Sequence, residues 1–142
     1  MNIKIIRENA TIPTYGTIHA AGADLYACLD EIVTIKSGET KMVYTGICME
    51  IPEGLVGLVY ARSGMAVKQG VAPANKVGVI DSDYRGEIMV ALHNHSNVDV
   101  TVENGQRIAQ IVFTPYVKEN FNVVDELSDT KRGDGGFGST GR

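Results

Sequence analysis

Short apolar runs separated by turn residues fill most of the chain. Eight of these runs are rich in Val, Ile or Tyr and are predicted to form strands: Ile3–Ile6, Glu31–Ile35, Lys41–Ile51, Leu55–Tyr60, Val77–Ile80, Glu87–Leu92, Val98–Val102 and Arg107–Phe113. Gly, Asn, Pro and Ser residues punctuate the intervals between them. Many short strands with such turns are typical of β-sandwiches, barrels and jelly rolls. The pattern therefore predicts an all-β fold, a distorted jelly roll or β-sandwich barrel.

Helical periodicity is nearly absent. Ser63–Gln69 is the one segment that favours a helix, a short one in which Ser63 would act as the N-cap and Gly70 would end the helix. Four methionines lie within or beside apolar runs and are expected to fill gaps in the core: Met42, Met49, Met65 and Met89. With no internal repeat and no linker, the pattern indicates one folded domain.

Composition narrows the class of protein. The 142 residues are 44% hydrophobic and 21% charged, which is ordinary for a single globular domain. A net charge of -4 without a block of Lys or Arg makes a nucleic-acid-binding surface unexpected. Cys28 and Cys48 show no CxxC spacing and are expected to be buried free thiols in a reducing compartment. No signal peptide or membrane-length apolar run is visible, so we expect a cytoplasmic protein with no membrane partner.

The C-terminal segment has an unusual composition. Residues 132–142 contain five of the sixteen glycines and almost no apolar surface, so they cannot build a core. We therefore expect a folded domain over residues 1–125 and a flexible arm over residues 126–142. The arm could be a tail without function. It also holds groups suited to clamping a phosphate and a base: the Arg132 guanidinium, bare glycine N–H groups, the Ser139 and Thr140 hydroxyls, and the Phe137 ring.

Two further segments combine small residues with a polar group. Ala20–Ala27 brings the backbone close to a neighbour around one carboxylate, Asp24. Arg62, Ser63 and Gly64 follow each other where a strand is predicted to turn into a helix, and the free N–H groups of a helix start favour phosphate. Taken alone, the Arg-Ser-Gly sequence is a weak signal.

Two more segments place polar side chains in or after apolar strands. Asp81 ends a predicted strand, three residues before Tyr84. Its carboxylate could orient and deprotonate a water molecule, or it could belong to an ordinary Asp-Ser-Asp turn. Gln110 lies between Ala109 and Ile111, where its amide could donate to phosphate or could simply face solvent.

In this order and at these spacings, the five segments resemble the five motifs of the trimeric dUTP diphosphatase (dUTPase) family. The resemblance runs from about Thr11 to Arg142. Gln106 departs from the family, which usually has an acidic residue there, and we expect this to affect turn geometry and not chemistry. The resemblance implies Mg²⁺-assisted hydrolysis of dUTP to dUMP and pyrophosphate, which keeps uracil out of DNA and supplies dUMP for dTMP synthesis. It also implies a homotrimer with active sites at the subunit interfaces.

The resemblance assigns the phosphate chemistry to two carboxylates and a set of donors. Asp81 would hold the attacking water in line with the α-phosphorus. Asp24 would support the magnesium site through water. The residues implied to hold the triphosphate are Arg62, Ser63, Gly64 and Gln110.

The resemblance also assigns the base, the sugar and the arm. Asn75 and the backbone near Val79 would bind the uracil edge, and Tyr84 would pack under the deoxyribose and exclude a ribose 2′-hydroxyl. Arg132 would bind the γ-phosphate and Phe137 would stack on uracil, while the last residues of the arm would close over the phosphates: Gly138, Ser139 and Thr140.

Two other functions compete with this interpretation. A dCTP deaminase would share the fold and some motifs, but no glutamate is placed to activate water at a pyrimidine ring carbon, and the complete arm favours the diphosphatase. A non-catalytic nucleotide- or protein-binding module would be signalled by loss of Asp81, Tyr84 or the arm, and all are present. His93 and His95 could share a strand face like a metal-binding pair, but no third ligand is evident.

Overall fold

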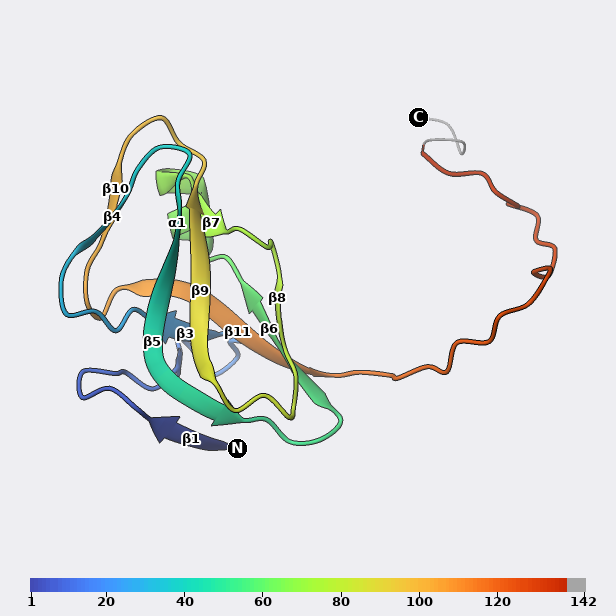
Figure 1. Ribbon diagram of the computed structural model, residues 1–142, viewed down its shortest axis with the longest axis horizontal. Helices are drawn as coiled ribbons and strands as arrows, with labels where there is room; N and C mark the ends of the chain where they lie inside the picture. Colours follow the sequence, from blue (N-terminus) through green and yellow to red (C-terminus); the bar gives the residue numbers. More distant parts are fainter. Residues whose placement is uncertain (138–142) are drawn as a thin grey trace.

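The computed structural model of the chain describes residues 1–137, and strands make up nearly all of its regular structure (Figure 1). The elements in chain order are β1 (Asn2–Ile5), β2 (Thr14–Tyr15), β3 (Ala23–Tyr26), β4 (Val33–Ile35), β5 (Thr40–Glu50), β6 (Leu55–Tyr60), α1 (Ser63–Gln69), β7 (Val71–Pro73), β8 (Gly78–Ile80), β9 (Glu87–Asn94), β10 (Val100–Val102) and β11 (Arg107–Pro115). The prediction of an all-β fold with one short helix is confirmed.

The strands form three antiparallel sheets. One sheet has the order β1-β5-β9-β7, a second has the order β2-β3-β11-β6-β8, and β10 pairs with β4 in a small third sheet. The long strands β5 and β9 run side by side, and the chain after β11 leaves the body of the fold (Figure 1). Since consecutive strands often belong to different sheets, the chain crosses between the two larger sheets several times.

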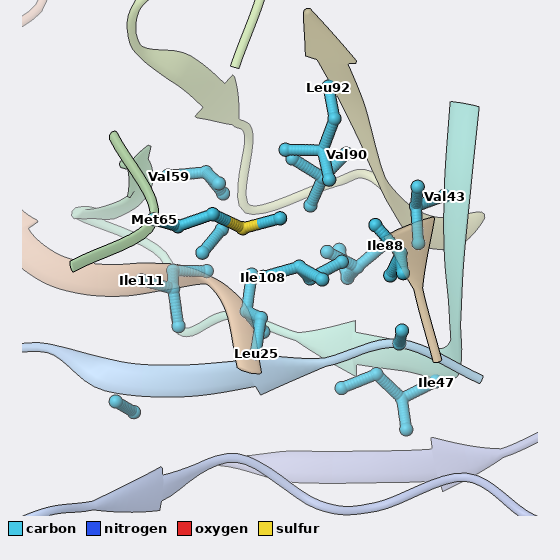
Figure 2. Close-up of a cluster of buried hydrophobic side chains, with 14 of the residues drawn as sticks. Leu25, Val43, Ile47, Val59, Met65, Ile88, Val90, Leu92, Ile108 and Ile111 are labelled. Carbon is cyan, nitrogen blue, oxygen red and sulfur yellow. The ribbon is translucent and has the colours of Figure 1, made fainter. Parts of the chain in front are cut away.

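The core lies between the two larger sheets. Ile88, Val90 and Leu92 of β9 alternate inward and point toward Ile108 and other side chains of the opposite sheet (Figure 2). Met65 of α1 reaches into the same cluster (Figure 2). This alternation, with one face buried and the other outward, is what an antiparallel sheet packed on one side requires.

The same alternation corrects part of the prediction for the methionines. Met49 and Met65 are buried in the core as expected. Met42 and Met89 are 47% and 39% exposed, because they lie on the outer face of the β5–β9 pair. Their neighbours Val43 and Val90 take the inward positions.

The helix spans the predicted residues, but its start differs from the prediction. Arg62 is the N-cap residue, with extended φ and ψ of -87° and 132°, and no side chain among residues 1–137 caps the helix with a hydrogen bond. Ser63 is therefore not the cap, because it is already the first helical residue. Gly70 ends the helix in the left-handed conformation, as expected, and its N–H bonds the Met65 carbonyl.

Three short strands escaped prediction: β2, β3 and β7. β3 begins with Ala23 and Asp24, which have little strand preference, and its pairing with β2 and β11 makes it a strand. β7 ends in Pro73, which is tolerated because β7 is an edge strand.

Both cysteines are free, but only Cys28 is buried. Cys48 is half-buried, because it alternates along β5 with the inward-facing Ile47 and Met49.

The chain beyond β11 buries little of its apolar surface against the rest of the protein. Residues 116–137 contain no strand or helix, and most of them are exposed. Phe121 and Val123 are 96% and 102% exposed. Within residues 1–137, no helix has the length and hydropathy needed to cross a membrane.

A bulge in β5 lets the N-terminal segment approach the sheet closely. Four steps along β5, from Tyr44 to Cys48, face only two steps of β9, from Met89 to Glu87. Gly46 within the bulge has a φ of +71°, and a Cβ there would lie 2.6 Å from the Ala10 Cβ. Glycine is therefore required both by the backbone conformation and by the space.

We expect Gly46→Ala to lower the free energy of unfolding by about 3–5 kcal/mol, since left-handed strain and overpacking both contribute. Gly38→Ala is the matched control: Gly38 has a similar φ of +74°, but apart from its chain neighbours no described residue has an atom within 4 Å of the position that an added Cβ would take. It should cost only about 1 kcal/mol. Urea unfolding at equal protein concentration measures both variants, and equal losses would show that the contacts of Gly46 do not matter.

Candidate functional site

Asp24 holds two arginines from different parts of the chain. Arg62 Nε donates to Asp24 Oδ1 at 2.7 Å, and an Arg107 Nη donates to Oδ2 at 3.3 Å. Only 13% of the Asp24 side chain is exposed, against 27% for Arg62 and 51% for Arg107. Because Arg62 uses its Nε here, its two terminal nitrogens remain for an incoming anion. Together with Gln110, these residues are called the arginine cluster below.

Gln110 fixes the backbone at this cluster. It lies in the central strand β11, level with Asp24 of β3 on one side and Tyr60 of β6 on the other. Its Nε2 donates to the Ala61 carbonyl at 2.9 Å. A Cβ on Gly22 would overlap the Gln110 side-chain oxygen, so the small residue lets β3 approach. Gln110 is half-buried, so part of its side chain still reaches solvent, and its role as a phosphate donor stays a prediction.

Ser63 and Gly64 form the exposed start of α1, directly after Arg62. Arg107 was not anticipated as part of this cluster. It lies 83 positions from Asp24 in the sequence, and no local pattern connects the two.

A second set of predicted residues surrounds a hollow of about 260 Å³. The structure brings together four of them here, from the loop before β8, from β8 itself and from the turn after it: Asn75, Val79, Asp81 and Tyr84. The other walls come from Ile80 and from β9 and the outer face of β5: Met42, Glu87, Met89 and Ala91. The methionines were missed as site residues because both faces of these strands carry apolar side chains. This space, with the residues that line it, is called the hollow.

Tyr84 is held in one orientation. Its N–H donates to the Asp81 carbonyl at 3.2 Å, and its hydroxyl donates to the Glu87 carbonyl at 3.0 Å. A Cβ on Gly86 would collide with the Tyr84 ring, so the ring lies directly against Gly86. The tyrosine therefore forms a fixed wall of the hollow.

Asp81 follows the last residue of β8 and is exposed. It borders both the hollow and a larger open groove that Tyr116 and Lys118 also line. Within residues 1–137, no hydrogen bond or ion pair engages its carboxylate, which can therefore accept a proton from a ligand or water.

The arginine cluster and Asp81 lie at opposite ends of one sheet. Ile80 of β8 pairs with Gly57 of β6, so Asp81 lies level with Val56. Arg62 is six residues further along the chain from Val56, which at strand spacing places the two about 20 Å apart. A single chain therefore does not bring Asp81 and Arg62 together.

Comparisons with known proteins match this fold over its whole length. A protein-family model described as dUTPase matches residues 8–141. This chain belongs to the dUTPase family. The resemblance inferred from the motifs is thereby confirmed.

Similar family members come from bacteria and a bacteriophage. The chain is 49% identical over 139 residues to the deoxyuridine 5′-triphosphate nucleotidohydrolase of Hydrogenobaculum sp., covering 98% of this chain and 96% of that protein. The corresponding protein of Desulfitobacterium hafniense is 52% identical over 131 residues, covering 92% and 87%. A solved dUTPase of Staphylococcus bacteriophage 80alpha with dUpNHpp superposes with a TM-score of 0.90 at 27% identity, covering 99% and 98%.

The arm of this dUTPase family member makes only local hydrogen bonds among the described residues. Arg132 Nε donates to the Gly135 carbonyl at 2.7 Å, and the Phe137 side chain is fully exposed. Gly138, Ser139 and Thr140 lie outside the described residues. The segment runs away from the sheets (Figure 1). In this position the described part of the arm does not reach the arginine cluster or the hollow of its own chain, so its predicted roles require it to move or to bind another copy.

Within the described residues, no group of three or more His, Cys, Asp or Glu side chains could hold a metal ion. Mg²⁺ commonly keeps several waters and takes its remaining ligands from one or two carboxylates and the substrate phosphates. His93 and His95 have ring centroids 4.3 Å apart, and His93 Nδ1 bonds the Thr40 hydroxyl at 2.8 Å. Burial lowers the pKa of His95. The pair is explained by packing.

We expect Gly22→Ala and Gly64→Ala to change stability in opposite directions. An added methyl at Gly22 displaces Gln110 from the Ala61 carbonyl and should cost about 1–3 kcal/mol of unfolding free energy. Gly64 lies in α1 with nothing within 4 Å of the added atom, so alanine should stabilise by up to about 1 kcal/mol. Thermal and urea unfolding measure both. Losses of equal size would mean that Gln110 tolerates displacement.

Proposed function

We propose that this chain is a dUTP diphosphatase that hydrolyses dUTP to dUMP and pyrophosphate. The observation that carries the proposal is the 49% identity, over 98% of the chain, to a protein named for that reaction. The bound dUpNHpp of the bacteriophage dUTPase, whose fold covers 99% of this chain, supports the same substrate.

The hollow is suited to bind the nucleoside. Asn75 and the backbone near Val79 bind the uracil edge, which rejects other bases because mismatched polar groups would stay buried and unpaired. Tyr84 packs under the deoxyribose, and its fixed ring leaves no room for a ribose 2′-hydroxyl. Met89 and Met42 supply apolar contact beside the ring.

Asp81 activates water at the edge of the hollow. Its carboxylate orients a water molecule toward the α-phosphorus and accepts the proton as the phosphorus–oxygen bond forms and pyrophosphate leaves. A carboxylate general base contributes about 10²–10⁴-fold. Positioning and compensation of phosphate charge supply the remainder, as is general for phosphoryl transfer.

The triphosphate is bound by Arg62 and Gln110, by the N–H groups of Ser63 and Gly64, and by Arg132. The arm closes over the substrate through Phe137 on the uracil and Gly138, Ser139 and Thr140 over the phosphates. Asp24 supports Mg²⁺ through water, and the ion, when bound, neutralises phosphate charge.

The enzyme acts as a homotrimer with sites at the subunit interfaces. The separation of about 20 Å between Asp81 and Arg62 supports this, because both must reach one triphosphate. The exposed apolar side chains that follow β11, such as Phe121 and Val123, also favour contact with another copy. We further propose a cytoplasmic role that keeps uracil out of DNA and supplies dUMP for dTMP synthesis.

Pyrophosphate release from dUTP, dCTP, dTTP and UTP, with Mg²⁺ and with EDTA, tests the function. Release confined to dUTP and lost with EDTA is expected. Ammonia release from dCTP would identify a deaminase. Binding of nucleotide without turnover of any of the four would indicate a binding module.

Asp81→Asn should lower kcat for dUTP by about 10²–10⁴-fold, because the amide cannot accept the proton of the attacking water. Affinity for dUpNHpp, measured by calorimetry, should change little. Asp30→Asn, at an exposed carboxylate outside both clusters, is the control and should keep normal kcat. A near-normal rate for Asp81→Asn would remove this residue from the role of base.

Mixing two inactive variants tests the shared site. Asp81→Asn and Arg62→Gln subunits, unfolded together and refolded in equal amounts, should recover about one quarter of wild-type activity, since that share of sites joins an intact Asp81 to an intact Arg62 from another chain. If both residues came from the same chain, the mixture would stay as inactive as its components. Size-exclusion chromatography confirms that each variant assembles alone.

A further inference from the structure

The position of Tyr84 depends on where β9 begins. The hydroxyl of Tyr84 donates to the backbone carbonyl of Glu87, the first residue of β9. Gly86 leaves the ring in direct contact with the backbone between them. Any shift of Glu87 therefore moves the wall of the hollow that Tyr84 forms.

The side chain of Glu87 anchors that residue to two other segments. Its Oε1 accepts the Gly46 N–H at 2.8 Å and Arg7 Nε at 3.1 Å, while Oε2 accepts an Arg7 Nη at 3.3 Å. Only 13% of the Glu87 side chain is exposed. A carboxylate with three donors in a half-buried setting is held more firmly than an exposed ion pair.

The bulge explains why the Glu87 side chain, and not the backbone, holds the start of β9 to β5. The backbone ladder between β5 and β9 is interrupted between Tyr44 and Cys48, so the Gly46 N–H points to a carboxylate instead of a strand carbonyl. The start of β9 is thus tied to β5 through the Glu87 side chain, where a regular sheet would use backbone hydrogen bonds.

Arg7 is itself fixed against the bulge. Its guanidinium lies over the Tyr44 ring, 4.6 Å from the ring centroid, and the Ile6 N–H donates to the Gly46 carbonyl at 2.9 Å. Hydrogen bonding to Glu87 raises the pKa of Arg7. The N-terminal segment therefore acts as a clamp on the first residue of β9.

We propose that Glu87, clamped by Arg7, is a positioning residue that sets Tyr84 for discrimination between deoxyribose and ribose. This rests on the proposed function, in which the sugar packs on Tyr84. Two alternatives remain. The ion pair between Arg7 and Glu87 could contribute only to stability, or Glu87 could contact the nucleotide directly, since it also borders the hollow.

The test compares kcat and KM for dUTP and UTP in four variants: Glu87→Gln, Arg7→Met, Tyr84→Phe and the double variant Glu87→Gln/Tyr84→Phe. Glu87→Gln and Arg7→Met should each lower the dUTP/UTP preference in kcat/KM by about five-fold, the effect of roughly one hydrogen bond, mainly through a lower KM for UTP, because a displaced ring no longer excludes the 2′-hydroxyl. In the Tyr84→Phe background the Glu87 substitution should add less than about two-fold, because the hydroxyl through which it acts is gone.

Glu39→Gln is the matched control. Glu39 also accepts a backbone N–H, from Lys36 at 2.9 Å, and pairs with Lys41 at 3.6 Å, but it lies outside the hollow and the arginine cluster. It should leave the dUTP/UTP preference unchanged. If Glu87→Gln does not fold, Arg7→Met still tests the clamp, since Arg7 is 39% exposed.

Two outcomes would overturn the inference. An unchanged preference in folded Glu87→Gln and Arg7→Met proteins would make the pair merely stabilising. A full effect that persists in the Tyr84→Phe background would mean that Glu87 acts on the nucleotide directly.

Failure of the proposed function is separable from failure of this inference. If the wild-type protein does not hydrolyse dUTP, NMR of ¹³C-labelled tyrosine rings still reports the position of Tyr84 without substrate. Its ring resonances should shift in Glu87→Gln and Arg7→Met and stay in place in Glu39→Gln. Unshifted resonances in the first two would overturn the positioning role.

Discussion

The antiparallel register of β11 between β3 and β6 is the constraint on which the rest of the molecule depends. It sets Gln110 level with Asp24 on one side and Tyr60 on the other, and so gathers the arginine cluster from three segments distant in sequence. The same register continues through β6 to β8 and fixes Asp81 at the far end of the sheet. One set of backbone pairings thus determines both the contents of the cluster and its distance from the carboxylate.

This separation has a functional consequence in the proposed trimer. A chain that held Asp81 and Arg62 together would present a complete site to solvent and could act on any triphosphate that reached it. With the two on different chains, binding and chemistry depend on assembly and on closure of the arm, and water is excluded only when all parts meet. The exposed apolar surface on β5, β9 and the arm is what such an arrangement leaves uncovered in one chain.

The sequence predicted those features that are local and failed where distant contacts decide. Strand β6 follows from its apolar run and the end of helix α1 follows from Gly70, and their bounds match the prediction. β3 was missed because Ala23 and Asp24 carry little strand preference, and its two neighbours make it a strand. Met42 was placed in the core because a strand with apolar residues on both faces does not reveal which face is covered. Arg7 and Glu87, eighty positions apart, have no local signature at all.

Three glycines of the motifs and the bulge show how the chain makes room for functional side chains. Gly22 admits Gln110, Gly86 admits the ring of Tyr84, and Gly46 admits Arg7 and Cys28. Of these, Gly46 alone also needs a positive φ, so at the other two the absence of a side chain is the requirement and not backbone freedom. A glycine costs stability because it loses more conformational freedom on folding than any other residue. That cost is offset where the neighbouring side chain, once admitted, is fixed by hydrogen bonds, as Gln110 is by Ala61 and Tyr84 is by Glu87. The positions of these glycines therefore mark the side chains whose orientation matters most.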